Sequence, residues 1–178
     1  SGIITATGVT AITGSISDVN DVLGAETSQG NAGQQIDLDT DFTVTISDTG
    51  SVAATTLTTL DSGVPGTVTA NDVATVTGTA TQVAAAAEAD RLGTLVLKAD
   101  FAATISDEGS VVATDLTKIT ARTSATINVT AVTKLTGTAA EVVAAIDDAQ
   151  VNHDANFLVE LTNDSTATAA DLKTINTA

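Results

Sequence analysis

The fold is decided by a stretch at residues 41–57 that reads DFTVTISDTGSVAATTL. It returns at residues 100–116 as DFAATISDEGSVVATDL. A weaker copy begins at Phe157, which stands in the place of Phe42 and Phe101. Self-similarity at a nearly constant period indicates a repeat architecture, in which each unit packs on the next.

A second block repeats in the same way. VATVTGT at residues 73–79 matches VTKLTGT at residues 132–138 and, in the first part of the chain, VTAITGS at residues 9–15. The chain is therefore predicted to be a single array, residues 1–178, of about three permuted repeats, each roughly 56–64 residues long. The approximate units are 1–64, 65–123 and 124–178.

Local signals predict short strands and short helices. The runs at residues 42–46 and 95–97 have strand length and are rich in β-forming residues. Residues 79–82 and 138–141 follow a glycine and have the pattern of a capping box, which begins a helix. The sequence thus predicts a repeat solenoid of short β-strands alternating with short helical turns. The alternative is an immunoglobulin-type sandwich, which would need about seven alternating strands and an aromatic core; the chain has three Phe and no Trp.

Composition excludes several classes of protein. The net charge of −16, with only six basic residues, argues against a nucleic-acid partner, because phosphate contacts need Lys and Arg. No apolar run approaches the roughly 20 residues that span a bilayer. The absence of Cys removes thiolate chemistry, and His153, the only His, cannot build a zinc site alone. No Gly-x-Ser-x-Gly motif is present, so we expect no enzymatic activity.

Acidic residues at alternate positions suggest calcium. Asp37, Asp39 and Asp41 stand at the first, third and fifth positions of an EF-hand-like loop, with Asp48 at the twelfth. Phe42 departs from that pattern, because the sixth position should be Gly. A second candidate set in the last repeat is Asn152, Asp154 and Asn156. The alternative is that these side chains alternate along a strand and face solvent.

The middle repeat has Val96, Lys98 and Asp100 at these positions, which cannot bind a cation. Charge is also uneven along the chain. Residues 1–90 carry eleven acids and no base, and residues 91–178 carry eleven acids and six bases. In a solenoid, order in the sequence becomes order along the axis, so one end is expected to be the more acidic.

The pattern Val-x-x-x-Asp-Leu-x-x-Ile at residues 111–119, followed by TGTAAEV at residues 136–142, resembles tandem repeats of giant secreted or cell-surface proteins. Such proteins occur in marine cyanobacteria and other aquatic bacteria, and similar repeats occur in phage fibres. The similarity covers about residues 3–176. The resemblance implies an extracellular or cell-surface structural or adhesive role, and it offers no catalytic residues.

Neither end of the array resembles a polar capping repeat, which solitary solenoids usually have. Ile3, Ile4, Val9 and Ile12 lie near the start, and Leu172 and Ile175 lie near the end. The chain also starts and stops at nearly the same point of the repeat. We therefore expect an extracellular structural protein, a subunit or segment of a fibre, sheath or surface layer, whose partner is another copy stacked head to tail or neighbouring repeats of a longer chain. The alternatives are an adhesin or receptor-binding module of a surface protein or phage fibre, and a calcium-dependent spacer in a giant secreted polypeptide.

Overall fold

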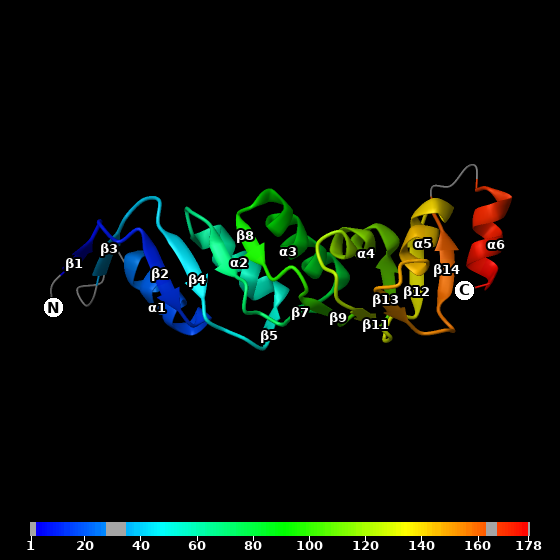
Figure 1. The fold of residues 1–178 in the computed structure, drawn as a ribbon, viewed down its shortest axis with the longest axis horizontal. Helices are drawn as coiled ribbons and strands as arrows, with labels where there is room; N and C mark the ends of the chain where they lie inside the picture. The colour runs from blue at the N-terminus through cyan, green and yellow to red at the C-terminus, as the bar shows by residue number, and fades with distance from the viewer. Residues whose placement is uncertain (1–2, 28–34, 163–166, 178) are drawn as a thin grey trace.

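The chain folds into an elongated body in which strands and helices alternate. The computed structural model describes residues 3–27, 35–162 and 167–177. The elements succeed one another along the long axis, so the two termini lie at opposite ends (Figure 1). The α/β class and the alternation of short strands with short helices, which the sequence predicts, are confirmed.

The described helices are all short. They are α1 (Ile16–Thr27), α2 (Ala54–Gly63), α3 (Ala80–Leu92), α4 (Ala113–Thr120), α5 (Ala139–Ile146) and α6 (Ala169–Thr177).

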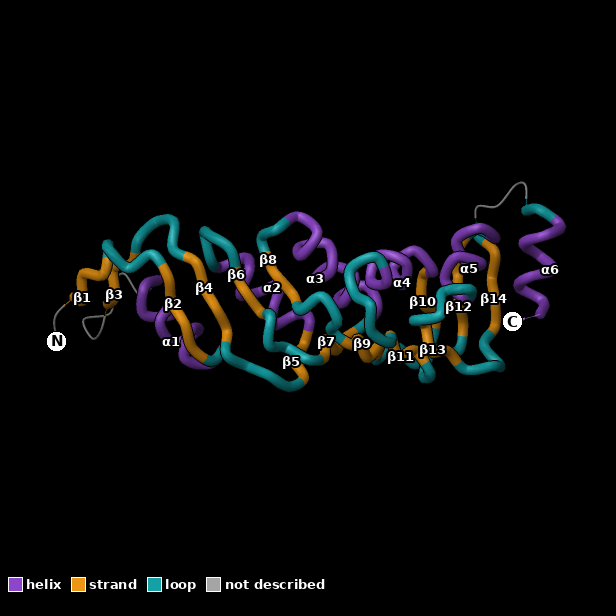
Figure 2. Tube along the Cα trace, in the orientation of Figure 1, coloured by secondary structure: helices purple, strands orange, loops and turns teal. Residues whose placement is uncertain are grey.

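The described strands, which are orange in Figure 2, form four sheets. The first sheet contains β1 (Ile3–Ala6) and β3 (Gln35–Leu38). The second contains β2 (Ala11–Gly14), β4 (Thr43–Ile46), β6 (Val68–Ala70) and β8 (Leu95–Leu97). The third contains β5 (Ser51–Ala53), β7 (Thr75–Gly78), β9 (Ala102–Ile105), β11 (Ile127–Val129) and β13 (Val151–His153). The fourth contains β10 (Ser110–Val112), β12 (Lys134–Gly137) and β14 (Leu158–Leu161).

Every pairing between these strands is parallel, which removes the immunoglobulin-type sandwich, because that fold is built from antiparallel sheets. Parallel neighbours need a crossover connection, and here the other elements of the repeat provide it. The chain passes through β4, β5 and α2, and then β6 returns to pair with β4.

We call the three elements that bring the chain back to its previous sheet, such as β4, β5 and α2, one round. The pairing register shows how the length of the sequence repeat compares with these rounds. Val44 of β4 pairs with Val68 of β6, which pairs in turn with Leu95 of β8, so two rounds carry the chain from Val44 to Leu95. The repeat that sets Asp41 equivalent to Asp100 sets Val44 equivalent to Ala103. Ala103 does not lie on β8 but on β9, the next strand along the chain. A sequence repeat is therefore longer than two rounds by one strand with its turn.

The following repeat shows the same excess. Ala103 of β9 pairs with Ile127 of β11, which pairs with Val151 of β13. The repeat that sets Phe101 equivalent to Phe157 sets Ala103 equivalent to Val159, which lies on β14, again the next strand. The equivalent strands β4, β9 and β14 thus lie in three different sheets, the second, the third and the fourth.

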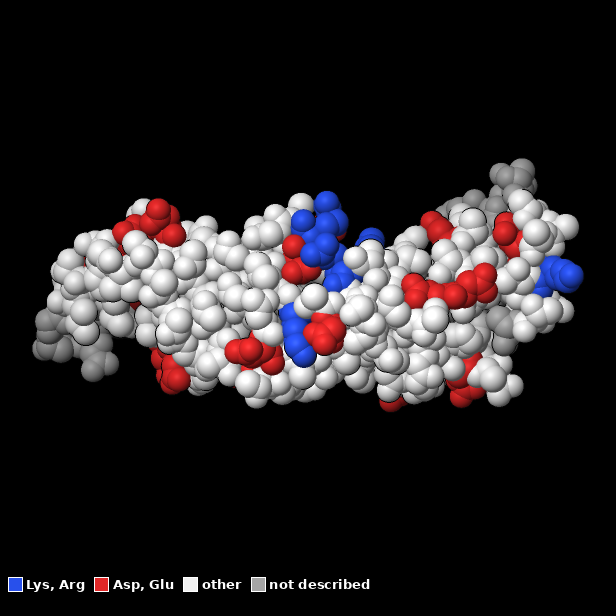
Figure 3. All heavy atoms as spheres, viewed as in Figure 1, with Lys and Arg blue, Asp and Glu red and all other residues white. Residues whose placement is uncertain are grey.

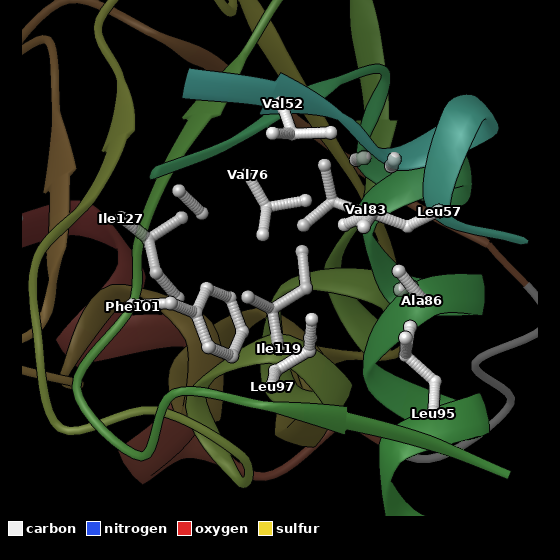
Figure 4. Close-up of a cluster of buried hydrophobic side chains, with 14 of the residues drawn as sticks. Val52, Leu57, Val76, Val83, Ala86, Leu95, Leu97, Phe101, Ile119 and Ile127 are labelled. Atoms are coloured by element: carbon white, nitrogen blue, oxygen red, sulfur yellow. The ribbon is translucent and has the colours of Figure 1, made fainter. Parts of the chain in front are cut away.

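The core is a continuous column of Val, Leu, Ile and Ala, with Phe42 and Phe101 as its largest members. Figure 4 shows part of it, with side chains from strands of different rounds directed toward one another. In most strands from β4 to β12 alternate residues are buried, as Val44 and Ile46 are in β4, while Thr43 and Thr45 face solvent. Thr and Val suit a half-buried parallel strand because β-branched side chains pack well on a pleated surface.

The two predicted capping boxes are confirmed. The Thr79 hydroxyl accepts from the Gln82 N–H, and the Gln82 side chain accepts in turn from the Thr79 N–H. Thr138 and Glu141 make the same exchange at the start of α5. Helix α3 ends at Gly93, whose φ of 82° places it in the left-handed region that glycine adopts at low cost.

The repeated Ser-Asp pair gives helix starts a further contact from the next round of the chain. The Ala80 N–H, first in α3, donates to the Asp107 carboxylate (N···Oδ2 2.7 Å). At the start of α1 the Ile16 N–H donates to Asp48 (N···Oδ2 2.8 Å). A carboxylate at this position satisfies an otherwise unpaired N–H and interacts favourably with the helix dipole. Asp48 and Asp107 therefore recur because each one fastens a helix to the neighbouring round.

Candidate functional site

The first set of candidate calcium ligands lies along β3 and the turn that follows it. Asp37 is exposed on the strand, and Leu38 beside it points into the core. Asp39 and Asp41 face each other across the turn, and a hydrogen bond and charge repulsion from Asp39 raise the pKa of the Asp41 carboxyl. Asp48 is the partner of the α1 N-terminus, so its Oδ2 already accepts a hydrogen bond.

The equivalent turn of the middle repeat supplies its own cation. Lys98 stands where the first repeat has Asp39, and its ammonium pairs with the Asp100 carboxylate at 3.1 Å. Asp100 corresponds to Asp41. The first repeat thus has two like charges at a position where the middle repeat has an ion pair.

The second candidate set lies at the other end of the body. Asn152 is exposed on β13, while Asp154 and Asn156 occupy the turn between β13 and β14. The Asp154 carboxylate accepts from the Asn156 N–H (N···Oδ1 2.9 Å), which stabilises the turn locally. The His153 ring packs edge-on against Phe157, with 4.8 Å between ring centroids.

Within the described residues, no three His, Cys, Asp or Glu side chains gather in a way that could hold a metal ion. Calcium also accepts amide and carbonyl oxygens, and calcium binding by these two sets stays a prediction of the sequence.

Basic residues gather near the middle of the face drawn in Figure 3, over α3 and α4. A groove of about 330 Å³ between these helices has Arg91, Lys118 and Arg122 among its lining residues. All three cations are paired: Arg91 with Glu88, Lys118 with Asp115 and Arg122 with Asp90. The hydrogen bonds from Arg91 lower the pKa of Glu88.

The carboxylates of two of these pairs, Asp90 and Asp115, also contact the neighbouring round of the chain. The Arg122 guanidinium donates to Asp90, a largely buried carboxylate at the end of α3 (Nε···Oδ2 2.7 Å), and the Leu97 N–H donates to the other oxygen of Asp90 (2.8 Å). Asp115 accepts from Lys118 at 3.0 Å and from the Thr81 hydroxyl of α3 at 2.9 Å. These charges are therefore used to hold α3 and α4 together, which sequence reasoning did not foresee.

Open strand edges and exposed apolar side chains mark both ends of the body. Strand β1 pairs only with β3 among the described strands, and β14 pairs only with β12. The large exposed apolar side chains gather largely at these places. They are Ile3, Ile4 and Val9 at one end and Leu158 and Leu172 at the other, with Leu92 and Val112 between.

At the C-terminal end the uncovered surface is hollowed. A cavity of about 480 Å³ opens between β14 and α6, and Phe157, Val159, Leu172 and Ile175 are among its lining residues. The sequence named Leu172 and Ile175 as uncapped, but not Phe157 or Val159. The repeat gives a signal for both residues, because Phe157 is the weakened third copy of Phe42 and Phe101 and Val159 stands in the place of Val44 and Ala103.

Comparison with protein-family models, with curated proteins and with solved structures finds no match for the chain. Among the described helices, none combines the length and the apolar character that crossing a membrane requires.

Proposed function

We propose that this protein is an extracellular structural repeat protein, a solenoid whose copies stack end to end within a fibre, sheath or surface layer. The observation that carries the proposal is a contrast in burial between equivalent positions. Apolar residues are exposed at both ends of the body, near open strand edges, although the equivalent residues elsewhere in the chain are buried.

The solenoid itself is inferred from the strand pairings. Three elements bring the chain back to its previous sheet, and a sequence repeat contains seven elements, as from β4 to β8 or from β9 to β13. Two rounds use six elements, so a repeat of seven elements exceeds two rounds by one element. We infer a three-sided superhelix in which every repeat is displaced by one side relative to the last.

The ends of such a superhelix favour association. An open strand edge presents unpaired N–H and C=O groups, which pair readily with another strand. Solenoids that stay monomeric usually cover these edges with a polar repeat. Here Ile4 of β1 is 60% exposed, and Val159 of β14 lines an open cavity.

The extracellular location is proposed from composition and from the resemblance to surface repeats. Abundant Thr, 22 acidic residues and no Cys suit a protein that is exposed to salt water and needs no disulfide. The paired cations of the α3–α4 groove have a structural use and favour no receptor or glycan ligand.

The test is electron microscopy of the purified chain at high concentration in 1 M NaCl, together with light scattering. We expect filaments whose axial repeat equals the length of one chain. Monodisperse short rods under all conditions would contradict self-assembly and would favour the adhesin alternative or a segment of a longer array.

A further inference from the structure

The hollow at the C-terminal end corresponds, residue for residue, to a covered surface in the middle of the chain. The repeat makes Phe157 equivalent to Phe101 and Ile175 equivalent to Ile119. In the middle repeat both equivalents are fully buried, and Figure 4 shows them directed into one cluster with Ile127 of the following strand, β11. At the C-terminal end Phe157 and Ile175 line an open cavity instead.

The segment that would fill this cavity is present at the other end of the same chain. By the repeat spacing, Ile127 of β11 is equivalent to Val68 of β6 and to Ile4 of β1. Val68 and Ile127 are fully buried, whereas Ile4 is 60% exposed.

Val9 behaves in the same way as Ile4. Val9 is 40% exposed, although its equivalents Val73 and Val132 are buried. The N-terminal end thus offers the apolar side chains that the C-terminal end lacks.

We infer that β1 of a second copy adds to the open edge of β14 as a parallel strand and that its Ile4 fills the cavity between β14 and α6. This inference rests on the proposed function and specifies the joint. Within the chain Val44 pairs with Val68, and Ala103 pairs with Ile127. The same pairing across the joint sets Val159 opposite Ile4 of the next copy, and Glu160 opposite Thr5.

The helices at the joint follow the same precedent. Helices α2 and α3 pack together where the first repeat meets the second, and α4 and α5 pack where the second meets the third. The joint would pack α6 against α1 of the next copy. It would also cover Leu172, which is 45% exposed although its equivalents Leu57 and Leu116 are fully buried.

A second copy is the occupant because the covering segment must carry apolar, inward-facing residues in the spacing of Ile4, Ala6 and Val9, which the N-terminal end of this chain has. The two surfaces of the joint lie at opposite ends of the chain, so the contact is not self-complementary. A head-to-tail contact of this kind leaves the far end free and propagates. Each copy carries a net charge of −16, so repulsion opposes the contact and salt should strengthen it by screening.

The test compares two substitutions on one strand, using the full chain in size-exclusion chromatography with light scattering at 0.1 M and 1 M NaCl. We expect the wild type to elongate, more at 1 M NaCl, and Ile4→Asp to stay monomeric. Ile3→Asp is the matched control, because Ile3 is 65% exposed but its equivalents Thr67 and Thr126 are not buried, so this variant should elongate like the wild type. Both sites are exposed, and circular dichroism melting curves should show both variants folded.

A mixing experiment tests the polarity of the joint. Ile4→Asp blocks the N-terminal surface of the joint, and Leu172→Asp blocks the C-terminal surface. Neither variant should therefore assemble alone, and an equal mixture should give dimers and nothing larger. The pairing register is tested by the double variant Thr5→Cys and Glu160→Cys, which should form disulfide-linked ladders, because the natural chain has no Cys. The control pair Ile3→Cys and Glu160→Cys, displaced along the strand, should link much less.

The outcomes separate the joint from the function. If the wild type forms filaments and Ile4→Asp forms them equally well, the joint is wrong and the proposed function stands. If the wild type is monomeric at 1 M NaCl and high concentration, both are wrong.

Discussion

At the scale of single residues, the turn after β3 holds an unfavourable pair that the middle repeat has replaced. Asp39→Lys copies the Lys98–Asp100 ion pair into the first repeat, so we expect the melting temperature at pH 7 to rise. Because the pKa of Asp41 is raised in the folded chain, its contribution to stability is present at acid pH and is lost as the pH rises through that pKa. The gain from Asp39→Lys should therefore shrink at acid pH, where Asp41 is protonated, and melting curves across pH will measure this.

The same turn decides whether calcium binds. If Asp37, Asp39 and Asp41 hold a cation, millimolar Ca²⁺ should raise the melting temperature of the wild type relative to EDTA, because a ligand specific for the folded state stabilises it. Asp39→Lys is the matched control and should show no response. Identical wild-type curves in Ca²⁺ and EDTA would dispose of this site.

The capping hydroxyl of α5 allows a comparison between two nearby threonines. Thr138→Ala removes the acceptor of the Glu141 N–H and should cost about 1 kcal/mol of unfolding free energy in urea titrations. Thr133 is exposed, and its hydroxyl donates long hydrogen bonds to backbone carbonyls, at 3.3 and 3.4 Å, so Thr133→Ala should cost clearly less. Equal losses would mean that the cap contributes nothing of its own.

At the scale of elements, helices are held by carboxylates from the next round of the chain. Asp107→Ala leaves the Ala80 N–H of α3 without its partner and should cost about 1 kcal/mol. Glu108→Ala, which changes the neighbouring exposed acid, is the control for loss of charge and should be near neutral. Hydrogen exchange should show the first turn of α3, and not the rest of the helix, opening more readily in Asp107→Ala.

An element could be predicted from the sequence where the residues that cause it are neighbours in the chain. The capping boxes at Thr79 and Thr138 and the strands at β4 and β8 depend on neighbouring residues, and the sequence locates them. The role of Asp48 and Asp107 depends on contacts 32 and 27 residues away, and sequence reasoning assigned Asp48 to calcium instead. The pairing of Asp90 with Arg122 is equally distant and gives no local signal.

At the scale of the whole molecule, the equivalent strand pairings predict that the repeats are exchangeable. Every repeat meets the next in the same way: Val68 of β6 lies opposite Val44 of β4, as Ile127 of β11 lies opposite Ala103 of β9. The sequence shows the period, but the period alone does not reveal that a repeat exceeds two rounds. That excess is visible only once the partner of each strand is known.

Deletion of residues 65–123 tests this exchangeability, because it joins Val64 to Ser124 at equivalent points of the repeat. Strand β11 would then follow α2 and pair with β4, with Ile127 replacing Val68 opposite Val44, and both of these side chains are buried in the intact chain. We expect a folded rod about one third shorter by small-angle scattering, with a lower melting temperature, because the stability of repeat arrays is close to a sum over repeats and their interfaces. A matched control deletes residues 65–115, which joins Val64 to Leu116 in the middle of α4, so that the second half of that helix follows α2 at the place where β11 should follow. That variant should unfold or aggregate. If both deletions fold equally well, or neither does, the repeats are not the units in which this molecule is built.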